Sequence, residues 1–377
     1  MTANGDRSTA KILTNAEEGA TLKLWSMTVD QRLARQLDRA KISRDKSSGG
    51  LLMLLRGDYV YEDVLLTGMA QAASGTVLVD EDEKPVAALI SLEEEQAYAD
   101  FLQTQHGPGP DGSLLLTAAD IGGRYNKKLR KREDPILRQV TLGKVDAIER
   151  RLYHGAYKGV TDLVTKYLWP EPALHVTRLC SKLGLSPNMV TSASFILVLA
   201  AMYLFWIGAF GWGLVAAWGM TFLDTVDGKL ARVTLTSSPF GNVFDHGIDL
   251  IHPPFWYWAW AIGCMALGFP LENFTALLSV IVGGYIFQRL QEGVFMTAFG
   301  MEMHIWRPFD SAFRLITARR NPNLLILTAS VLFARPDLGL LAVAWWTVLS
   351  IAVHMVQIFQ AMMARRRGDK LVSWLAQ

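Results

Sequence analysis

The chain has 377 residues, of which 51% are hydrophobic and 19% are charged, and its formal net charge is +2. This composition is too apolar for an ordinary soluble enzyme, and it excludes collagen and intrinsic disorder. A net charge so close to zero gives no support for nucleic-acid binding, which needs basic residues massed on one face. The charges are also uneven, because residues 1–188 hold 50 of them and residues 189–377 hold 22. The chain therefore has a polar first half and an apolar second half.

The N-terminal sequence and the two cysteines indicate in which cellular compartment the chain begins and what the cysteines do. Residues 1–20 start with a polar stretch and lack the basic and apolar regions of a secretory signal peptide, so we expect a flexible N-terminus in the cytoplasm. Cys180 and Cys264 are far apart, so we expect neither a disulfide scaffold nor a cysteine zinc site.

Residues 21–122 show the pattern of a small cytoplasmic α/β domain. Apolar runs and turn residues alternate there at short spacing, which is typical of mixed strands and helices. The expected elements are a helix at 27–40, strands at 51–55, 75–79 and 85–90, a helix at 92–104 and a loop at 106–113.

Residues 123–187 are expected to form a charged linker with interfacial amphipathic helices. The run KKLRKRED at 127–134 is typical of a solvated helix face, and the alternative is a basic segment on an anionic membrane surface. Residues 161–183, which include Trp169 and two prolines, predict an interfacial helix pair that leads into a bilayer.

Six apolar segments follow, and they predict a bundle of six transmembrane helices over residues 188–367, followed by a tail at 368–377. Each span needs roughly 20 apolar residues. The segments lie at 189–208, 212–231, 243–267, 273–296, 323–335 and 338–364, of which the fifth is the shortest.

The loop charges predict the orientation of these segments, because cytoplasmic loops carry excess Lys and Arg. The connections after the second, fourth and sixth segments are basic, whereas the opposite loops have Arg335 as their main positive charge. We therefore expect a multi-pass protein of the cytoplasmic membrane with both termini and the site facing the cytoplasm.

Four aspartates stand at the ends of the second and third apolar segments. Asp224 and Asp227 are three residues apart, and Asp245 and Asp249 are four apart, so each pair projects from one face of a helix. Four carboxylates in a partly desolvated site repel one another unless positive charge compensates them. Oxygen ligands without cysteine favour Mg²⁺ or Mn²⁺, and two pairs supply enough ligands for a two-metal site of the kind that handles phosphates.

Small residues and one arginine accompany the aspartates. Gly228 and Ala231 leave a strip with little side chain, where a ligand could approach the backbone, and Arg232 follows directly. Small residues also allow membrane helices to pack closely. Helix packing alone could therefore explain Gly228 and Ala231. The combination with the carboxylates and Arg232 favours a ligand site.

These positions resemble a known family. Asp224, Asp227, Gly228, Ala231, Arg232, Gly241, Asp245 and Asp249 match the signature D-x-x-D-G-x-x-A-R-x8-G-x3-D-x3-D of the CDP-alcohol phosphotransferases. The resemblance covers about residues 155–365. It implies that the four aspartates hold the metal ions, that Asp249 is also the general base, and that the nucleotide binds at Asp227, Gly228, Ala231, Arg232 and Gly241. It also suggests a homodimer.

The acceptor side is less defined by the sequence. Positive-inside anchoring explains four arginines, Arg307, Arg314, Arg319 and Arg320, and the alternative is that they bind the phosphate of an anionic acceptor. Arg289 and Glu292 are expected to neutralise each other at a cavity wall. His246 and His252 flank the aspartates and are expected to make ordinary hydrogen bonds, with His252 orienting Asp249 as the alternative.

The first domain is similar to sugar-phosphate nucleotidyltransferases over residues 54–70, where Asp58 stands at the usual place of a metal ligand. Residues 1–50 show neither the initial strand nor the Gly-rich loop that would hold a triphosphate. We therefore expect a degenerate nucleotidyltransferase-like domain with a structural, regulatory or partner-binding role.

The predicted function is an integral membrane transferase of phospholipid biosynthesis. It would move a substituted phosphate group from a CDP-alcohol, CDP-diacylglycerol above all, to a hydroxyl of a polyol or polyol-phosphate acceptor of the inositol phosphate or glycerol phosphate type, and would release CMP. One alternative is a soluble CDP-polyol donor such as CDP-inositol. Alternatives of other classes are a divalent cation transporter and an inactive scaffold, although an ion pathway has no need of Gly228, Ala231 and Arg232.

Overall fold

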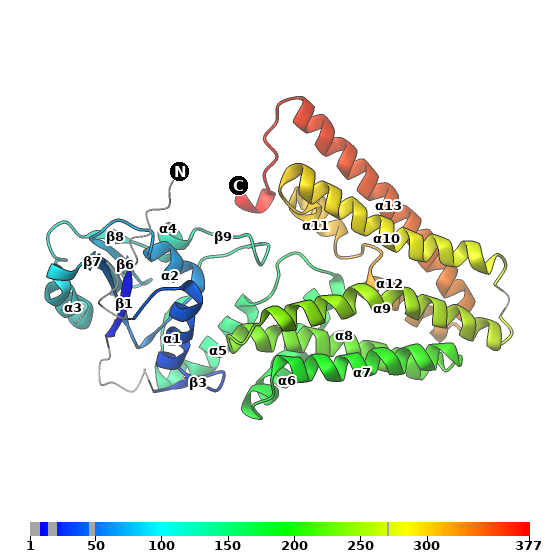
Figure 1. Cartoon of the computed structure of the whole chain (residues 1–377), viewed down its shortest axis with the longest axis horizontal. Helices are drawn as coiled ribbons and strands as arrows, with labels where there is room; N and C mark the ends of the chain where they lie inside the picture. The colour runs from blue at the N-terminus through cyan, green and yellow to red at the C-terminus, as the bar shows by residue number, and fades with distance from the viewer. Residues whose placement is uncertain (1–7, 14–20, 45–49, 270) are drawn as a thin grey trace. The chain divides into compact units, whose positions relative to one another are not determined.

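The computed structural model describes residues 8–13, 21–44, 50–269 and 271–377 (Figure 1). Contacts within the chain divide it into two units. The front unit comprises Met1–Lys127, Arg132–Tyr157 and Val233–Leu235. The helical unit comprises Lys128–Lys131, Lys158–Arg232 and Thr236–Gln377.

The front unit is built on a five-stranded mixed sheet. Its strands lie in the order β1 (Thr9–Leu13), β4 (Leu51–Arg56), β7 (Pro85–Ser91), β6 (Thr76–Val79) and β8 (Leu114–Leu116). The two outer pairs, β1 with β4 and β6 with β8, are parallel, whereas β7 runs antiparallel to both of its neighbours.

Helices cover both faces of this sheet (Figure 1). In β4, Met53 and Leu55 belong to the core under α1 (Val29–Ala40) and α2 (Asp63–Met69). Leu52 and Leu54 belong to the core under α3 (Glu95–Thr104). Because successive side chains of a strand point to opposite faces, an unbroken apolar strand such as β4 suits a sheet that is buried on both sides.

Short elements complete the front unit. They are β2 (Lys23–Leu24), β3 (Met27–Thr28), β5 (Tyr59–Tyr61), η2 (Leu92–Glu94), α4 (Ala118–Gly122), β9 (Tyr125–Asn126), β10 (Lys131–Arg132), β11 (Leu137–Gln139), η3 (Leu142–Lys144) and α5 (Val145–Gly155). One of them, β10, also includes Lys131 of the helical unit.

Two expectations about the first half were wrong. The structure contains an initial strand, β1, where a flexible N-terminus was expected; residues 1–7 and 14–20 lie outside the described residues. The basic run 127–134 is not a helix, because β9 and β10 form a hairpin around it. Arg130 has a φ of 50°, a left-handed conformation that interrupts a helix, and Pro135 disfavours helical backbone at Asp134.

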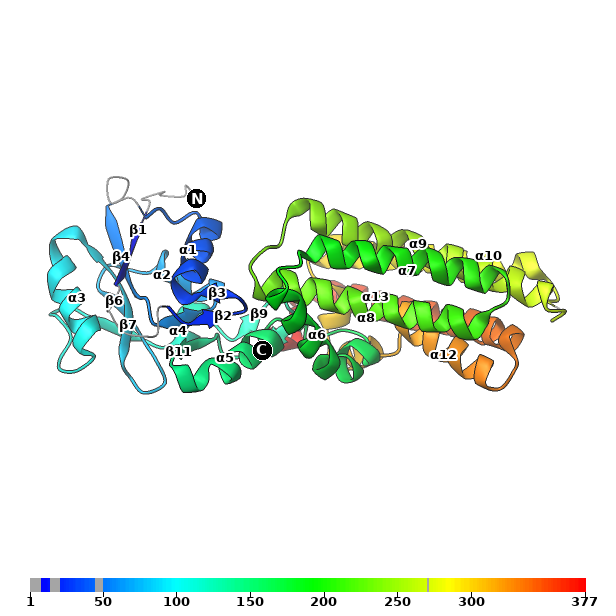
Figure 2. The same cartoon turned by 90° about the horizontal axis from the view of Figure 1, so that it is seen from below.

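The helical unit contains the second half of the chain (Figure 2). The six expected apolar segments each fall on one helix, in the order α7, α8, α9, α10, α12 and α13. The elements are η4 (Val164–Leu168), α6 (Pro170–Lys182), α7 (Pro187–Trp206), α8 (Phe210–Val233), α9 (Pro239–Ala266), α10 (Phe274–Phe299), η5 (Met303–Ile305), α11 (Pro308–Phe313), α12 (Arg320–Leu332), α13 (Pro336–Arg366) and η6 (Trp374–Ala376).

Two helices of the described part of the chain, α7 and α13, are long and apolar enough to cross a membrane. A shared core joins them to the other long helices. It includes Phe205 of α7, Ala217 of α8, Trp260 of α9 and Val343 of α13. Apolar packing of this kind holds the ends of α8 and α9 in place, and the four aspartates are found at those ends.

The close approach of α7 and α9 supports a first prediction. A Cβ added at Gly263 would overlap the carbonyl oxygen of Phe205. Because a backbone atom cannot rotate away, Gly263→Ala should force the helices apart and cost about 1–3 kcal/mol of stability. Thermal unfolding in detergent checks this, with Gly283→Ala in α10 as the control. An added Cβ there meets no heavy atom within 4 Å. A melting temperature of Gly263→Ala equal to that of the control would contradict this packing.

Candidate metal and transfer site

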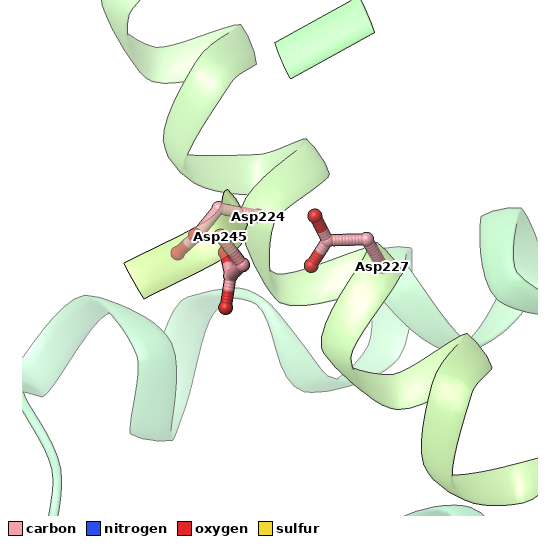
Figure 3. A group of neighbouring side chains, drawn as sticks. All are labelled: Asp224, Asp227 and Asp245. Atoms are coloured by element: carbon pink, nitrogen blue, oxygen red, sulfur yellow. The ribbon is translucent and has the colours of Figure 1, made fainter. Parts of the chain in front are cut away.

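The two aspartate pairs come together at the ends of two successive helices. Asp224 and Asp227 belong to α8, and Asp245 and Asp249 belong to α9. One carboxylate oxygen from each of Asp224, Asp227 and Asp245 lies within 4.8 Å of the others (Figure 3). The three side chains converge from the two helices, as the predicted helical faces require. This group can therefore hold a divalent cation through oxygen ligands.

Asp227 is the most buried member of the group. Its side chain is 3% exposed, and its Oδ2 accepts a hydrogen bond of 2.6 Å from the Thr191 hydroxyl of α7. Its Oδ1 is buried with no hydrogen-bond partner in the described structure. A carboxylate oxygen left without a partner in this way is costly unless a cation binds to it. The donor set therefore fits a metal ion.

Asp249 and Asp224 share one arginine partner. Asp249 Oδ1 is ion-paired with Arg320, the first residue of α12, and the same guanidinium donates a hydrogen bond of 2.6 Å to Asp224 Oδ2. Arg320 is thus a bridge between the two aspartate pairs. The sequence predicted Arg320 as an acceptor-phosphate ligand, but its guanidinium is engaged by the aspartates instead.

A small cleft lies on one side of the aspartates. Its wall contains four of the five residues predicted to bind nucleotide, Asp227, Gly228, Ala231 and Gly241. A Cβ at Gly241 would lie 2.7 Å from the Asn188 side-chain oxygen, so a larger residue there would require the Asn188 side chain to move. Arg232 does not line the cleft, and its guanidinium lies against Gly228 instead.

A larger cavity of about 600 Å³ lies next to Asp249. Asp249 and Arg320 form part of its wall, together with residues of α10 and of the segments on either side of α11. The cleft and the cavity share none of their lining residues. Two molecules could therefore reach the aspartates from separate hollows.

The structure brings three of the four predicted acceptor arginines to this cavity. Arg314, Arg319 and Arg320 line it. Arg307 was wrongly placed by the sequence argument: it lines another groove, where its guanidinium pairs with Asp310 at 2.9 Å and lies over the Trp306 ring. The Asp310 carboxylate also accepts a hydrogen bond of 2.9 Å from the Arg307 backbone N–H at the start of α11.

The expected pair of Arg289 and Glu292 is present at 3.4 Å in the cavity wall. Glu292 also pairs with Arg319 and lies 3.4 Å from His304 Nε2. Burial lowers the pKa of His304 to about 3, so its ring is neutral at physiological pH. One carboxylate therefore compensates two arginines here.

The two histidines beside the aspartates make ordinary hydrogen bonds, as expected. His246 Nδ1 lies 2.9 Å from the Asn242 carbonyl, and His252 Nδ1 lies 2.7 Å from the Ile248 carbonyl. His252 packs on Trp256, and no hydrogen bond to Asp249 is present in the described structure.

In the front unit, both oxygens of Asp58 are already engaged. Arg56 donates to them from two nitrogens at 3.0 Å and 2.8 Å, and the Gln139 amide donates to Oδ2 at 2.9 Å. A carboxylate that is satisfied by a bidentate arginine has little affinity left for a metal ion. This arrangement favours a structural role for Asp58.

Several site residues escaped the sequence argument. Thr191 and Asn188 lie in or next to an apolar helix and carry no charge or motif. Arg130 and Lys158 line the cavity although they precede the apolar segments by more than 25 residues. A basic run is a general feature of solvated surfaces, so no pattern in the sequence marks these two residues as cavity residues.

The helical unit therefore contains converging carboxylates beside two hollows, an arrangement that suits a metal ion with oxygen ligands. Residues 185–312 match the CDP-alcohol phosphatidyltransferase family. The match includes all four aspartates and the complete cleft.

Named relatives are similar over parts of the chain. An archaetidylinositol phosphate synthase from Pyrococcus horikoshii is 36% identical over 80 residues, which are 21% of this chain and 42% of the relative. Choline/ethanolaminephosphotransferase 2 from Arabidopsis thaliana is 38% identical over 81 residues, which are 18% of this chain and 21% of the relative. The matched regions therefore span less than half of these relatives.

Proposed function

We propose that the protein is an integral membrane transferase that moves a substituted phosphate group from a CDP-alcohol to the hydroxyl of an acceptor alcohol and releases CMP. The observation that carries this proposal is the convergence of three aspartates between a cleft and a cavity, in a segment that matches the CDP-alcohol phosphatidyltransferase family. The family supports a role in phospholipid head-group synthesis.

The proposed metal site uses Asp224, Asp227 and Asp245, whose oxygens converge. When bound, Mg²⁺ or Mn²⁺ would stabilise the negative charge that develops on the diphosphate. Asp249 would complete a second site if Arg320 released it. Asp227, Gly228, Ala231 and Gly241 are proposed to bind the cytidine side of the donor in the cleft, with Arg232 near its phosphates.

Asp249 is the proposed general base, because it lines the cavity from which an acceptor would approach. Its carboxylate would take the proton of the acceptor hydroxyl. The acceptor oxygen would then form a bond to the phosphorus that carries the donor's alcohol group, while the bond from that phosphorus to CMP breaks. CMP leaves with the electron pair of that bond.

The proposed setting is the cytoplasmic membrane, with six spans formed by α7 to α10, α12 and α13, and with the site on the cytoplasmic side. Basic residues support this orientation, because Lys229 and Arg232 end α8 and Arg365–Arg367 end α13. CDP-diacylglycerol is the proposed donor, since a membrane position gives access to a lipid. A homodimer is proposed from the family alone.

CMP release tests this function. Purified protein in detergent with Mg²⁺ or Mn²⁺ is offered CDP-diacylglycerol or soluble CDP-polyols, each with inositol phosphate, glycerol phosphate or the free polyols. We expect CMP release that requires the metal ion, one donor and one acceptor. Release with a soluble CDP-polyol alone would reassign the donor. No release from any pair, together with metal-dependent transport in vesicles, would replace the enzyme by a cation transporter.

A further inference from the structure

The cavity beside Asp249 contains more cations than its own carboxylates satisfy. Six basic side chains line it, against the acidic groups Asp162, Asp249, Glu292 and Glu302. Arg289, Arg319 and Arg320 are held in ion pairs with Glu292 and the aspartates. The remaining cations are Arg130, which pairs with Glu302, Lys158 and Arg314. Arg314 is one of the arginines expected to bind an acceptor phosphate, whereas Arg130 and Lys158 have no role in the transfer reaction as proposed.

Backbone contacts hold the first two of these residues. Arg130 belongs to the segment Lys128–Lys131, which is part of the helical unit. The Gly159 N–H donates to the Leu129 carbonyl at 2.8 Å, and a Cβ at Gly159 would lie 2.7 Å from the Lys131 side chain. The chain around Lys158 therefore lies in close contact with the chain around Arg130. Both segments precede the residues that match the family.

Two of these cations have donors without partners. Arg130 pairs with Glu302 at 2.9 Å through Nη1, yet its Nε is buried and has no hydrogen-bond partner in the described structure. Arg314 Nη1 is buried without a partner in the same way. A buried charged donor without an acceptor is costly, so both nitrogens require an acceptor that the chain does not supply.

The charges around Arg130 repel one another. Burial and the neighbouring Arg130 and Arg232 lower the pKa of Lys158. Burial and the neighbouring Arg319 lower the pKa of Arg314 to about 9, and Arg130 acts on it in the same direction. An anion in the cavity would relieve this repulsion and satisfy the buried donors.

We propose that Arg130 and Lys158, from segments that precede the family match, form with Arg314 an anion-binding subsite that holds a phosphate group on the acceptor. This inference rests on the proposed function and deepens it, because it selects a phosphorylated alcohol over a neutral one. The residues before the first long helix are then part of the substrate site. They are specificity residues, and the proton transfer stays with Asp249.

A binding experiment tests the subsite independently of the transfer reaction. The melting temperature of the full chain in detergent is measured with inorganic phosphate and with chloride at equal ionic strength. Phosphate should stabilise the wild type, and Arg130→Gln and Lys158→Gln should lose most of this stabilisation. Lys158→Gln removes no ion pair present in the described structure, so it also guards against misfolding of the Arg130 variant. Lys128→Gln is the matched control, because Lys128 is exposed on the same turn.

A kinetic experiment then assigns the phosphate to the acceptor. The KM for a phosphorylated acceptor should rise about tenfold to a hundredfold in both variants, because each loses a charge-assisted contact. The KM for the CDP-alcohol donor should stay unchanged. Equal phosphate stabilisation of wild type and variants would overturn the subsite. A rise confined to the donor KM would overturn its assignment to the acceptor. If no donor and acceptor pair releases CMP, the transferase proposal fails, and the melting experiment still decides whether the anion subsite exists.

Discussion

Replacement of Asp249 by asparagine is expected to reduce CMP release by about a hundredfold or more, because an amide cannot take the acceptor's proton. The substitution keeps the size of the side chain at the cavity wall. Asp224, Asp227 and Asp245 remain in place, so stabilisation by Mn²⁺ in a melting experiment should persist. Loss of turnover with retained metal binding separates the base from the ligands.

Asp369→Asn provides the control for this experiment. Asp369 is exposed in the tail after α13. Its substitution also replaces one carboxylate by an amide. We expect wild-type CMP release from it. Turnover of Asp249→Asn within a few-fold of this control would remove Asp249 from the mechanism and leave the proton to another group.

Replacement of Arg320 by glutamine is expected to have the largest effect on stability. The guanidinium joins Asp249 on α9 to Asp224 on α8, and its side chain is 15% exposed. Removal of one partner from a buried ion pair costs about 3–5 kcal/mol, because the remaining charges lose their compensation. The melting temperature of the metal-free variant should fall clearly below that of the wild type. Mn²⁺ should then stabilise the variant more than the wild type, since a cation can replace the lost charge.

Arg335→Gln is the matched control for Arg320. Arg335 also forms an ion pair, with Asp337 at 2.7 Å, but its side chain is 52% exposed. Exposed pairs contribute about 0–1 kcal/mol. A small change for Arg335→Gln and a large one for Arg320→Gln would agree with the bridge. Equal changes, with no added response to Mn²⁺, would show that Arg320 does not compensate the aspartates.

The positions of the long helices could be predicted because each corresponds to one apolar run. The aspartates could be predicted as a group because spacings of three and four residues fix a common helical face. The partners of these groups could not be predicted. Arg320 lies 71 residues beyond Asp249 along the chain. Nothing local distinguishes an arginine that bridges two helices from one that faces the membrane surface.

The first half shows the same limit. The helix α1 was predictable because Thr28 and Gln31 form a capping box at its start. The strand β1 was missed because its residues, TAKIL, include a lysine and alternate weakly, and its pairing is with β4, some 40 residues later. The turn around Arg130 was taken for a helix because charge density says little about backbone conformation.

The separation of the proposed nucleotide cleft from the proposed acceptor cavity has a stereochemical consequence. Asp227 and Asp245 line the cleft, and Asp249 lines the cavity, with no residue common to the two. An acceptor entering from the cavity meets the phosphorus while CMP departs through the cleft, so the two groups are never required to share one face. A single in-line displacement follows, and a donor made chiral at phosphorus with sulfur or oxygen isotopes should give a product of inverted configuration.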